Sequence, residues 1–247
     1  MKRSGILTGI ATLIVSFLLV GSPPAAADAL DSLERCIGAA EKVADYTAVI
    51  HQRQRINDVI RPEEVILYKF KRPNWVFIEW IGDVNNVMEV VYREGHDDNK
   101  LKVRLGGMLE GIVLRLNPGG SRSLEYTRHP IGESSLIHLL NTLEKSIRYS
   151  KAHPADELTV VDGGTMTVFG KELTRIVVTT PYRPGGPYYA PRSVFGIDET
   201  TNLPRYYASY GEAGELWEEY RFRELRVNVG LSDSDFEVKR TEHEFGT

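Results

Sequence analysis

Apolar and polar positions alternate over most of the chain after residue 45, and this pattern predicts a series of antiparallel β-strands. Runs of β-branched and aromatic residues with a period of two, separated by short polar turns, are typical of a β-meander. The predicted strands of the first half are Tyr46–Ile56, Glu64–Lys71, Trp75–Ile81, Met88–Arg93 and Leu101–Leu105. Because the connections are short, consecutive strands are expected to pair with each other.

The second half of the chain repeats this texture with longer and more aromatic strands. Leu158–Val161 and Met166–Phe169 are predicted to flank a hairpin turn at Asp162-Gly163-Gly164, because glycine tolerates the positive φ angles of such turns. Leu173–Thr180, two strands in the aromatic stretch 194–222 and a last strand from Trp217 to Val229 follow. Both halves together give about ten strands.

Two segments have the period of a helix. Leu30–Ala44 carries an apolar stripe and is expected to be capped by Asp28 or Asp31. A second helix is predicted from about Ser134, with Ser134 or Ser135 as its N-cap. Its apolar stripe consists of Leu136, Leu139, Leu140, Leu143 and Ile147. The only cysteine, Cys36, lies on the stripe of the first helix and is expected to act as a small buried hydrophobe.

These elements predict an α+β fold that is mainly β. Long antiparallel strands form a curved sheet, and alternate side chains then lie on a concave and a convex face. The large aromatic side chains of the last strands must be covered by the two helices, by an apolar ligand, or by both. They are Tyr206, Tyr207, Tyr210, Trp217, Tyr220 and Phe222. No internal repeat or low-complexity linker divides the chain, so residues 28–247 are predicted to form a single β domain.

The first 27 residues are typical of a secretory signal peptide. Lys2 and Arg3 precede the apolar stretch Ile6–Val20, and small residues end at Ala27, where cleavage is expected, with Ala29 as the second choice. The alternative is an uncleaved anchor, but a membrane span needs roughly 20 apolar residues. Cys36 lies outside the small-residue box of a lipoprotein signal. The predicted location is therefore the periplasm, with no stable membrane span after cleavage.

Charge and composition exclude some partners. The chain has 30 basic and 34 acidic residues, a formal charge of −4, and loss of Lys2 and Arg3 with the signal makes it −6. A mildly acidic chain with mixed signs argues against a nucleic-acid partner. With one cysteine, an internal disulfide framework is impossible.

Two sequence patterns near the end of the chain carry a family resemblance. They are Asp198…Thr201…Leu203-Pro204 and Asn228…Leu231-Ser232-Asp233…Asp235-Phe236, and they follow an export signal, a first helix and the strand Pro73-Asn74-Trp75-Val76-Phe77-Ile78-Glu79-Trp80. In this order they resemble the LolA/LolB-like superfamily of bacterial periplasmic lipoprotein carriers. The stretches 106–118 and 128–131 resemble domain-of-unknown-function family 1571, a branch of that superfamily. The resemblance implies an unclosed antiparallel barrel, helices that plug its mouth and an apolar cavity for acyl chains; it transfers no individual functional residue.

Catalytic and metal sites are not predicted, and no cofactor is expected. The six histidines are not spaced three or four residues apart and have no cysteine near them, so they are interpreted as surface or capping residues. The acidic run His96–Asn99 lacks the spaced oxygen ligands of a calcium loop and is better explained as a hairpin turn. A hydrolase would need His129 beside Ser134 or Ser135, with Asp156, in a cleft; no Gly-x-Ser-x-Gly motif supports it. We therefore expect a protein that is not an enzyme.

Candidate residues for a hydrophobic cavity lie on two predicted strands and in an irregular apolar stretch. They are Val76, Ile78 and Trp80, then Leu109, Ile112 and Leu114 near the mouth, then Tyr220 and Phe222. A register error of one residue would turn any of these strands to the other face. The stretch 108–116 can also be core, and the Pro/Gly/Tyr-rich segment 182–189 can be a lid, a partner loop or an ordinary connection.

The function predicted from these features is the binding of an apolar or amphipathic ligand by an exported, non-catalytic periplasmic protein. A lipoprotein acyl chain or another envelope lipid is the expected ligand class, and an acylated protein is the expected partner. The alternative is an envelope protein-interaction or sensor module on the same scaffold. That alternative would show a shallow groove and an exposed apolar patch, where the carrier would show a deep cavity.

Overall fold

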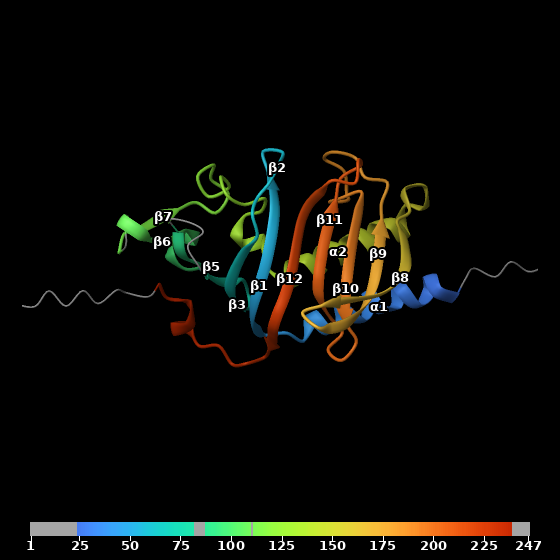
Figure 1. Ribbon diagram of the computed structural model, residues 1–247, viewed down its shortest axis with the longest axis horizontal. Coiled ribbons are helices and arrows are strands. Elements are labelled where there is room, and N and C mark those ends of the chain that lie inside the picture. Colours follow the sequence, from blue (N-terminus) through green and yellow to red (C-terminus); the bar gives the residue numbers. More distant parts are fainter. Residues whose placement is uncertain (1–23, 82–86, 110, 239–247) are drawn as a thin grey trace, which may run out of the picture.

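A computed structural model describes residues 24–81, 87–109 and 111–238 of the chain. These residues form twelve β-strands and two α-helices, which confirms the mainly β, α+β class predicted from the sequence (Figure 1). The predicted signal sequence lies outside the described residues up to position 23. The helices are α1 (Pro24–Glu41) and α2 (Leu136–Ala152). The strands are β1 (Asp45–Ile56), β2 (Val59–Ile60), β3 (Glu64–Lys71), β4 (Trp75–Trp80), β5 (Val87–Arg93), β6 (Leu101–Leu105), β7 (Val113–Leu116), β8 (Thr159–Val168), β9 (Lys171–Thr179), β10 (Arg192–Asp198), β11 (Leu203–Tyr210) and β12 (Leu216–Val227).

All strands belong to one antiparallel sheet built from two meanders. The order is β7-β6-β5-β4-β3-β1-β12-β11-β10-β9-β8, and the short β2 pairs only with β1. Apart from the short β2, which lies between β1 and β3 in sequence, neighbours in the sheet are consecutive strands except at the central pair, β1 and β12, in which Ile50 lies opposite Phe222. The edge strands β7 and β8 do not pair with each other in the described part of the chain, so the barrel is not closed.

The two helices cover the concave face of the sheet at different distances. In α1 the buried positions include the small residues Ala29, Cys36 and Ala40, and this helix lies close to β8 and β11. In the described residues α2 packs against α1 and stands further from every strand. Small side chains permit a close approach of backbones, whereas the larger apolar stripe of α2 holds its axis away from the sheet. Burial raises the pKa of Cys36 to about 12, so this residue behaves as the predicted buried hydrophobe.

The predicted start of the first helix and the predicted first hairpin of the second half are wrong. The helix begins at Pro24, so Asp28 and Asp31 lie within it and cannot cap it; proline is well suited to the first turn. Residues 162–164 are a bulge inside the continuous strand β8, and the hairpin turn lies at Phe169-Gly170. The side chain of Asp162 accepts a hydrogen bond from the nitrogen of Gly164 (2.7 Å), which has φ +80°, so a bulge uses the same glycine chemistry as a turn.

Other local predictions are confirmed. Ser135 is the N-cap of α2, and its hydroxyl accepts a hydrogen bond from the backbone nitrogen of His138 (3.0 Å). The acidic run 96–99 is a turn in which Asp97 pairs with Arg93 and Lys102, both at 2.7 Å. Its carboxylate is thus satisfied by cations of the protein itself.

The segment 228–238 returns along the convex face and packs on β3 and β4. The Asp45 carboxylate accepts hydrogen bonds from the backbone nitrogens of residues 229–231, which turns the chain after β12. Lys69 and Lys71 then pair with Asp235 (2.9 Å) and Asp233 (2.8 Å). Phe236 is buried against Trp75 and Phe77. The convex face of these strands is therefore closed, and only their concave face remains available for a ligand.

Candidate functional site

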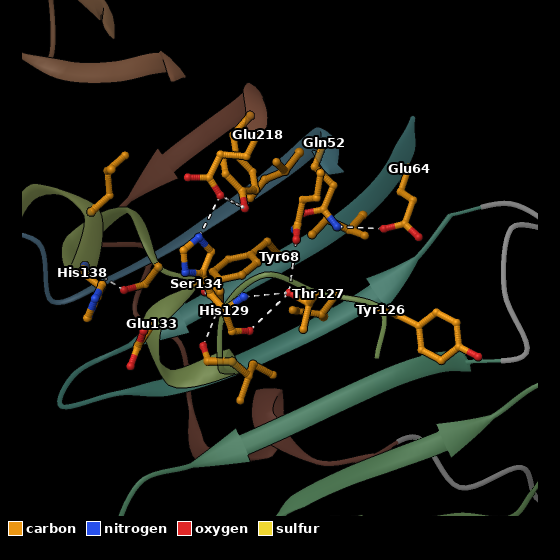
Figure 2. A pocket seen from close by; sticks show the side chains of 18 of the residues that line it. Gln52, Glu64, Tyr68, Tyr126, Thr127, His129, Glu133, Ser134, His138 and Glu218 are labelled. Carbon is orange, nitrogen blue, oxygen red and sulfur yellow. Dashed lines mark hydrogen bonds and ion pairs between the residues drawn. The ribbon is translucent and has the colours of Figure 1, made fainter. Parts of the chain in front are cut away.

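A large cavity lies between the concave face of the sheet and the elements that cover it. Its volume is about 1060 Å³. Helix α2 forms one wall, and the connection from β7 to α2, residues 117–135, forms part of the rim; we call this connection the crossing loop (Figure 2). Most lining side chains are apolar. On the strands they include Ile50, Ile66, Ile78, Val90, Val103 and Phe222, and on α2 they are Leu136, Leu139 and Leu143.

Six of the eight residues selected from the sequence line this cavity. Ile78 and Trp80 lie on β4, Leu114 on β7, and Tyr220 and Phe222 on β12, while Leu109 lies just before β7 at the rim. The side chains of β4 alternate as a half-buried strand requires, since Phe77 packs on the convex face against Phe236. The two strand faces expected to be concave are thus the ones that carry the lining residues.

The other two selected residues do not line the cavity. Val76 is on the concave side of β4 but is fully buried (0% exposed) in the main core, beyond the end of the cavity. Ile112 is 45% exposed. Its neighbours Leu109 and Val113 are exposed to a similar extent, 49% and 46%. These three form an exposed apolar patch at the β6–β7 end of the sheet. The irregular stretch 108–116 is therefore partly cavity wall and partly surface.

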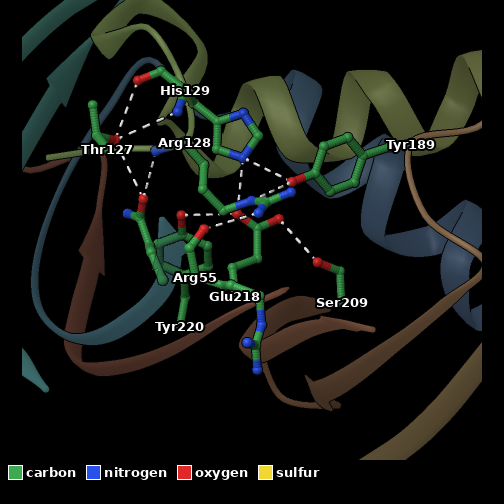
Figure 3. Close-up of polar contacts among 9 residues, drawn as sticks. Arg55, Thr127, Arg128, His129, Tyr189, Ser209, Glu218 and Tyr220 are labelled. Carbon is green, nitrogen blue, oxygen red and sulfur yellow. Dashed lines mark hydrogen bonds and ion pairs between the residues drawn. The ribbon is translucent and has the colours of Figure 1, made fainter. Parts of the chain in front are cut away.

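Sequence reasoning missed a polar cluster that lies against one wall of the cavity. Its centre is the carboxylate of Glu218 on β12, which is 2% exposed (Figure 3). His129 Nε2 donates to Glu218 Oε2 (2.8 Å), Tyr220 Oη donates to the same oxygen (3.1 Å) and Ser209 Oγ donates to Oε1 (3.2 Å). A signal was present in the sequence: Glu218, Tyr220 and Phe222 alternate on one strand face, so strand alternation could have indicated a carboxylate beside two cavity residues.

The same cluster fixes the crossing loop to the sheet. Buried Gln54 of β1 accepts hydrogen bonds at Oε1 from the backbone nitrogen of Arg128 (2.8 Å) and from Thr127 Oγ1 (3.3 Å). The Arg128 guanidinium donates to the backbone oxygen of Arg55 (3.0 Å) and to Tyr189 Oη (3.2 Å). It also stacks over the ring of Trp217 at 5.2 Å. The loop that closes one side of the cavity is thus held by polar bonds to β1 and β12.

The electrostatics of the cluster keep Glu218 ionised. Burial alone raises the pKa of its carboxyl group, but the hydrogen bond from His129 and the charges of His129 and Arg128 outweigh burial, so the net pKa is lowered. Burial raises the pKa of Tyr189 and Tyr220, which therefore keep their hydroxyl hydrogens. The result is one buried carboxylate surrounded by donors, which is the arrangement that makes a buried charge tolerable.

The arrangement has part of a hydrolase site but lacks its nucleophile. Glu218 and His129 form a carboxylate–imidazole pair, and Ser134 lines the same cavity. Ser134 Oγ, however, donates its hydrogen to the backbone oxygen of Ile131 (2.7 Å) and lies 2.9 Å from Tyr68 Oη. A hydroxyl whose hydrogen is used in this way is not set up to transfer it to His129. No hydrogen bond joins His129 to a serine within the described ranges.

Metal chemistry has no site in the part of the chain that the structure describes. No group of three or more His, Cys, Asp or Glu side chains there is arranged to hold a metal ion. Nor does any described helix have the length and apolar character that crossing a membrane requires.

The segment 182–189 is packed onto the cavity wall. Tyr188 is buried, and its hydroxyl donates to the backbone oxygen of Asp156. Tyr189 lines the cavity beside His129, and Tyr182 makes an edge contact with Trp217 (5.6 Å between ring centres). Arg183 pairs with Asp156 (2.5 Å). Tyr188 and Tyr189 are therefore part of the enclosure, whereas Tyr182 packs against Trp217 and does not line the cavity.

Comparison with known families places the chain in a group without an assigned function. Residues 43–245 match the family described as Protein of unknown function (DUF1571), so the chain belongs to that family, as its sequence predicted. No curated protein matches the sequence.

Several solved structures are similar to this chain in fold. A crystal structure of MucB has a TM-score of 0.48 and 16% identity over 86% of this chain, which spans 63% of that protein. The lipoprotein LppX of Mycobacterium tuberculosis has a TM-score of 0.47 and 12% identity, over 83% of this chain and 98% of LppX. A LolA superfamily protein of Nitrosomonas europaea has a TM-score of 0.32 and 9% identity, over 85% of this chain and 97% of the other. At these identities and TM-scores, we carry no ligand, partner or activity over to this chain.

Proposed function

We propose that this chain is an exported, non-catalytic binding protein that holds an apolar or amphipathic ligand in the cavity on the concave face of its sheet. The observation that carries the proposal is the cavity itself, about 1060 Å³ in volume and lined mostly by aliphatic and aromatic side chains. Small-molecule sites are typically about 300–1,000 Å³, so this space is at the upper end and suits a lipid-sized ligand. An acyl chain of a lipid or of a lipoprotein is the ligand class with the matching shape and polarity.

The energetics of such binding follow from burial. Each methylene group transferred from water into the cavity contributes about 0.8 kcal/mol, so ten of them contribute about 8 kcal/mol before the cost of association is subtracted. Loss of translational and rotational freedom costs at least about 4 kcal/mol. A ligand with one acyl chain is therefore expected to bind in the micromolar to millimolar range, and a ligand with two chains more tightly.

The periplasm is the proposed location. The predicted signal peptide, residues 1–27, would direct export, and cleavage after Ala27 would leave α1 to begin near Asp28. An apolar ligand needs a carrier to cross the aqueous periplasm, and a cavity enclosed between the concave face of the sheet, α2 and the crossing loop suits this task.

A second candidate function is an envelope protein-interaction module, and one observation favours it. The patch of Leu109, Ile112 and Val113 is exposed at the β6–β7 end of the sheet, next to the rim of the cavity. Exposed apolar patches frequently mark protein contacts. The depth of the cavity favours the carrier function over this alternative.

Native mass spectrometry tests the proposal. The full chain, produced with its own N-terminal segment and isolated from a bacterial periplasm under gentle conditions, is expected to carry an extra mass that organic extraction releases as a lipid or an acylated peptide. The stripped protein is expected to take up an apolar fluorescent probe, N-phenyl-1-naphthylamine, in a saturable way. A clean mass together with no uptake of the probe would contradict the carrier function and favour the interaction module. The same spectrum of the intact chain measures whether the signal was removed after Ala27.

A further inference from the structure

The cavity is much wider across the strands than along them. Its lining side chains come from ten adjacent strands, from β7 at one edge of the sheet to β9 near the other, with one to three residues on each. On β1, for example, Ile50, Gln52 and Gln54 face the cavity. Strands lie about 4.8 Å apart and rise about 3.4 Å per residue, so the lined face measures about 40 Å across the strands and about 14 Å along them. The cavity is therefore a slot that follows the curvature of the sheet.

A polar bridge crosses this slot at the central strands. Glu218 lies on β12, one strand of the central pair, and His129 lies on the crossing loop opposite it (Figure 3). Their hydrogen bond of 2.8 Å joins the sheet to the loop and leaves no room for a hydrocarbon chain between the two side chains. Apolar lining continues on both sides of the bridge. We call the β3–β7 side the long arm and the β9–β11 side the short arm; their lining includes Ile66, Ile78 and Val103 in the long arm and Val178 and Phe195 in the short arm.

The slot holds more than one hydrocarbon chain can fill. A methylene group is close in size to a water molecule, whose share of liquid volume is about 30 Å³, so a volume of about 1060 Å³ accommodates about 35 such groups. A single chain of about 16 carbons would fill roughly half of that volume. In a bilayer one chain spans about 15 Å, half of the hydrocarbon thickness, which is less than half of the width of the slot. One chain would therefore leave much of the apolar lining uncovered, whereas two chains cover both arms.

We infer that the ligand is an amphiphile with two hydrocarbon chains, one in each arm, whose polar junction lies beside the bridge of His129 and Glu218. This inference rests on the proposed function and names the class of its ligand. A junction between two chains matches polar side chains that have apolar walls on both sides, whereas an amphiphile with one chain has its polar group at one end. Lipids and acylated proteins can both carry such a pair of chains. Organic extraction of the ligand from the isolated protein distinguishes these two sources.

Counting bound molecules tests this inference. The full chain, stripped of ligand, is mixed with 1-monolauroylglycerol or with 1,2-dilauroylglycerol, which share an uncharged glycerol head and differ in the number of chains. Native mass spectrometry is expected to show two bound molecules of the first compound and one of the second. In displacement of N-phenyl-1-naphthylamine, dilauroylglycerol is expected to act at a concentration about 100-fold lower than monolauroylglycerol, because its second chain enters as part of a molecule that is already bound.

Variants assign one bound chain to each arm. Leu114→Trp narrows the long arm from β7, and Ser193→Phe narrows the short arm from β10. Each is expected to weaken one of the two binding steps of monolauroylglycerol at least about tenfold, or 1.4 kcal/mol, and to leave the other step unchanged. The control is Val113→Trp, which adds the same indole at a side chain that is 46% exposed and is expected to keep both steps. A thermal melt of each variant checks folding, and the count on the unmodified chain decides the question even if a variant is unstable.

Each outcome separates this inference from the proposed function. A single bound molecule of monolauroylglycerol, or three or more, overturns the two-chain inference and leaves the carrier function in place. Weakening of both binding steps by a substitution in one arm also overturns it, because the slot then acts as one undivided space. The same holds if the ligand extracted from the isolated protein has only one chain. If neither the fluorescent probe nor either glyceride binds, the proposed function itself is wrong.

Discussion

The two ends of the concave face are covered in different ways: one is mostly filled by core side chains, with only Val178, Phe195 and Tyr207 among those that reach the cavity, and the other encloses most of the cavity. At the β8–β11 end, α1 lies close to the sheet; Leu33 of α1 is 0% exposed, and Ile176 and Ile197 on the strands are 0% and 1% exposed. At the β3–β7 end, α2 and the crossing loop stand off the strands and enclose about 1060 Å³. The same kind of strand faces both regions. The size of the side chains on the covering helix, and the polar bonds that hold the crossing loop, therefore decide whether the sheet builds core or cavity.

This comparison predicts that the hollow end depends on its polar cluster for stability. Replacement of the central carboxylate, Glu218→Ala, leaves the donors of His129, Tyr220 and Ser209 without their acceptor and detaches the crossing loop. Loss of one partner of a buried charged pair costs about 3–5 kcal/mol of unfolding free energy. Urea unfolding measures this change. The matched control is Glu224→Ala on the same strand, where Glu224 is 55% exposed, its partner Arg223 is 57% exposed and the expected loss is at most about 1 kcal/mol. Equal losses for the two variants would show that the cluster has no special role.

The solid end is expected to respond to loss of volume and not to affect binding. Ile197→Ala opens a cavity under α1, and such substitutions typically cost about 2–5 kcal/mol. Ile197 does not line the ligand cavity, so the affinity for N-phenyl-1-naphthylamine is expected to stay within about twofold. Urea unfolding and probe titration on the same sample test both statements. A large loss of probe affinity with this variant would show that packing at the solid end affects binding at the hollow end.

At the hollow end, a substitution is expected to weaken probe binding and to leave the free energy of unfolding nearly unchanged. Leu114→Trp fills part of the cavity from β7 and should weaken probe binding at least about tenfold, or 1.4 kcal/mol, with little change in unfolding free energy. Its neighbour Val113 points outward and is 46% exposed, so Val113→Trp adds the same side chain without filling the cavity. Fluorescence titration of the two variants side by side gives the answer. If Val113→Trp weakens binding as much as Leu114→Trp, the probe does not occupy the cavity.

The smallest expected effect concerns the segment on the convex face. Hydrogen bonds from Lys69 and Ser232 lower the pKa of Asp235 to about 2. A carboxyl group whose pKa is lower in the folded than in the unfolded state stabilises the fold at pH values above its unfolded-state pKa, which is near about 3.9. This contribution disappears as the pH falls toward about 2. Because the pair is partly exposed, less than about 1 kcal/mol is expected between pH 5 and pH 2. Asp235→Asn should remove this part of the pH dependence in acid unfolding experiments and leave probe binding at pH 7 unchanged.

The sequence predicted most of the longer strands, because their β-branched and aromatic runs are local signals, but it missed the short β2 and β7. Alternation did not decide which face of β4 or β12 is concave; the structure places Ile78, Trp80, Tyr220 and Phe222 on the lining of the cavity. The start of the first helix was misjudged because residues up to Ala27 were assigned to the signal peptide, although proline at position 24 is well suited to the first turn of a helix. The bulge at residues 162–164 was misjudged because positive-φ glycine serves bulges and turns alike.

The polar cluster could not be assembled from sequence alone. Gln54, His129, Tyr189 and Glu218 come from four segments, and only the pairing of β1 with β12 brings Gln54 opposite Glu218. His129 was interpreted as a surface residue because its partner is 89 residues away. Strand alternation alone could have indicated Glu218, since it shares a face with Tyr220 and Phe222. The volume of the cavity depends on how far α2 stands from the sheet, which no local pattern encodes.

The order of the strands also has a consequence for how this chain reaches its native state. Each meander contains only contacts between neighbours in sequence, whereas the central pair β1–β12 joins residues about as far apart as Tyr46 and Val227. Long-range pairing carries a larger loop-closure cost and slows folding. On the proposed route of export, the first meander would leave the translocation channel well before β12, and the edge of β1 would stay unpaired until then. We expect pulsed hydrogen exchange to show protection within each meander before protection at the β1–β12 junction.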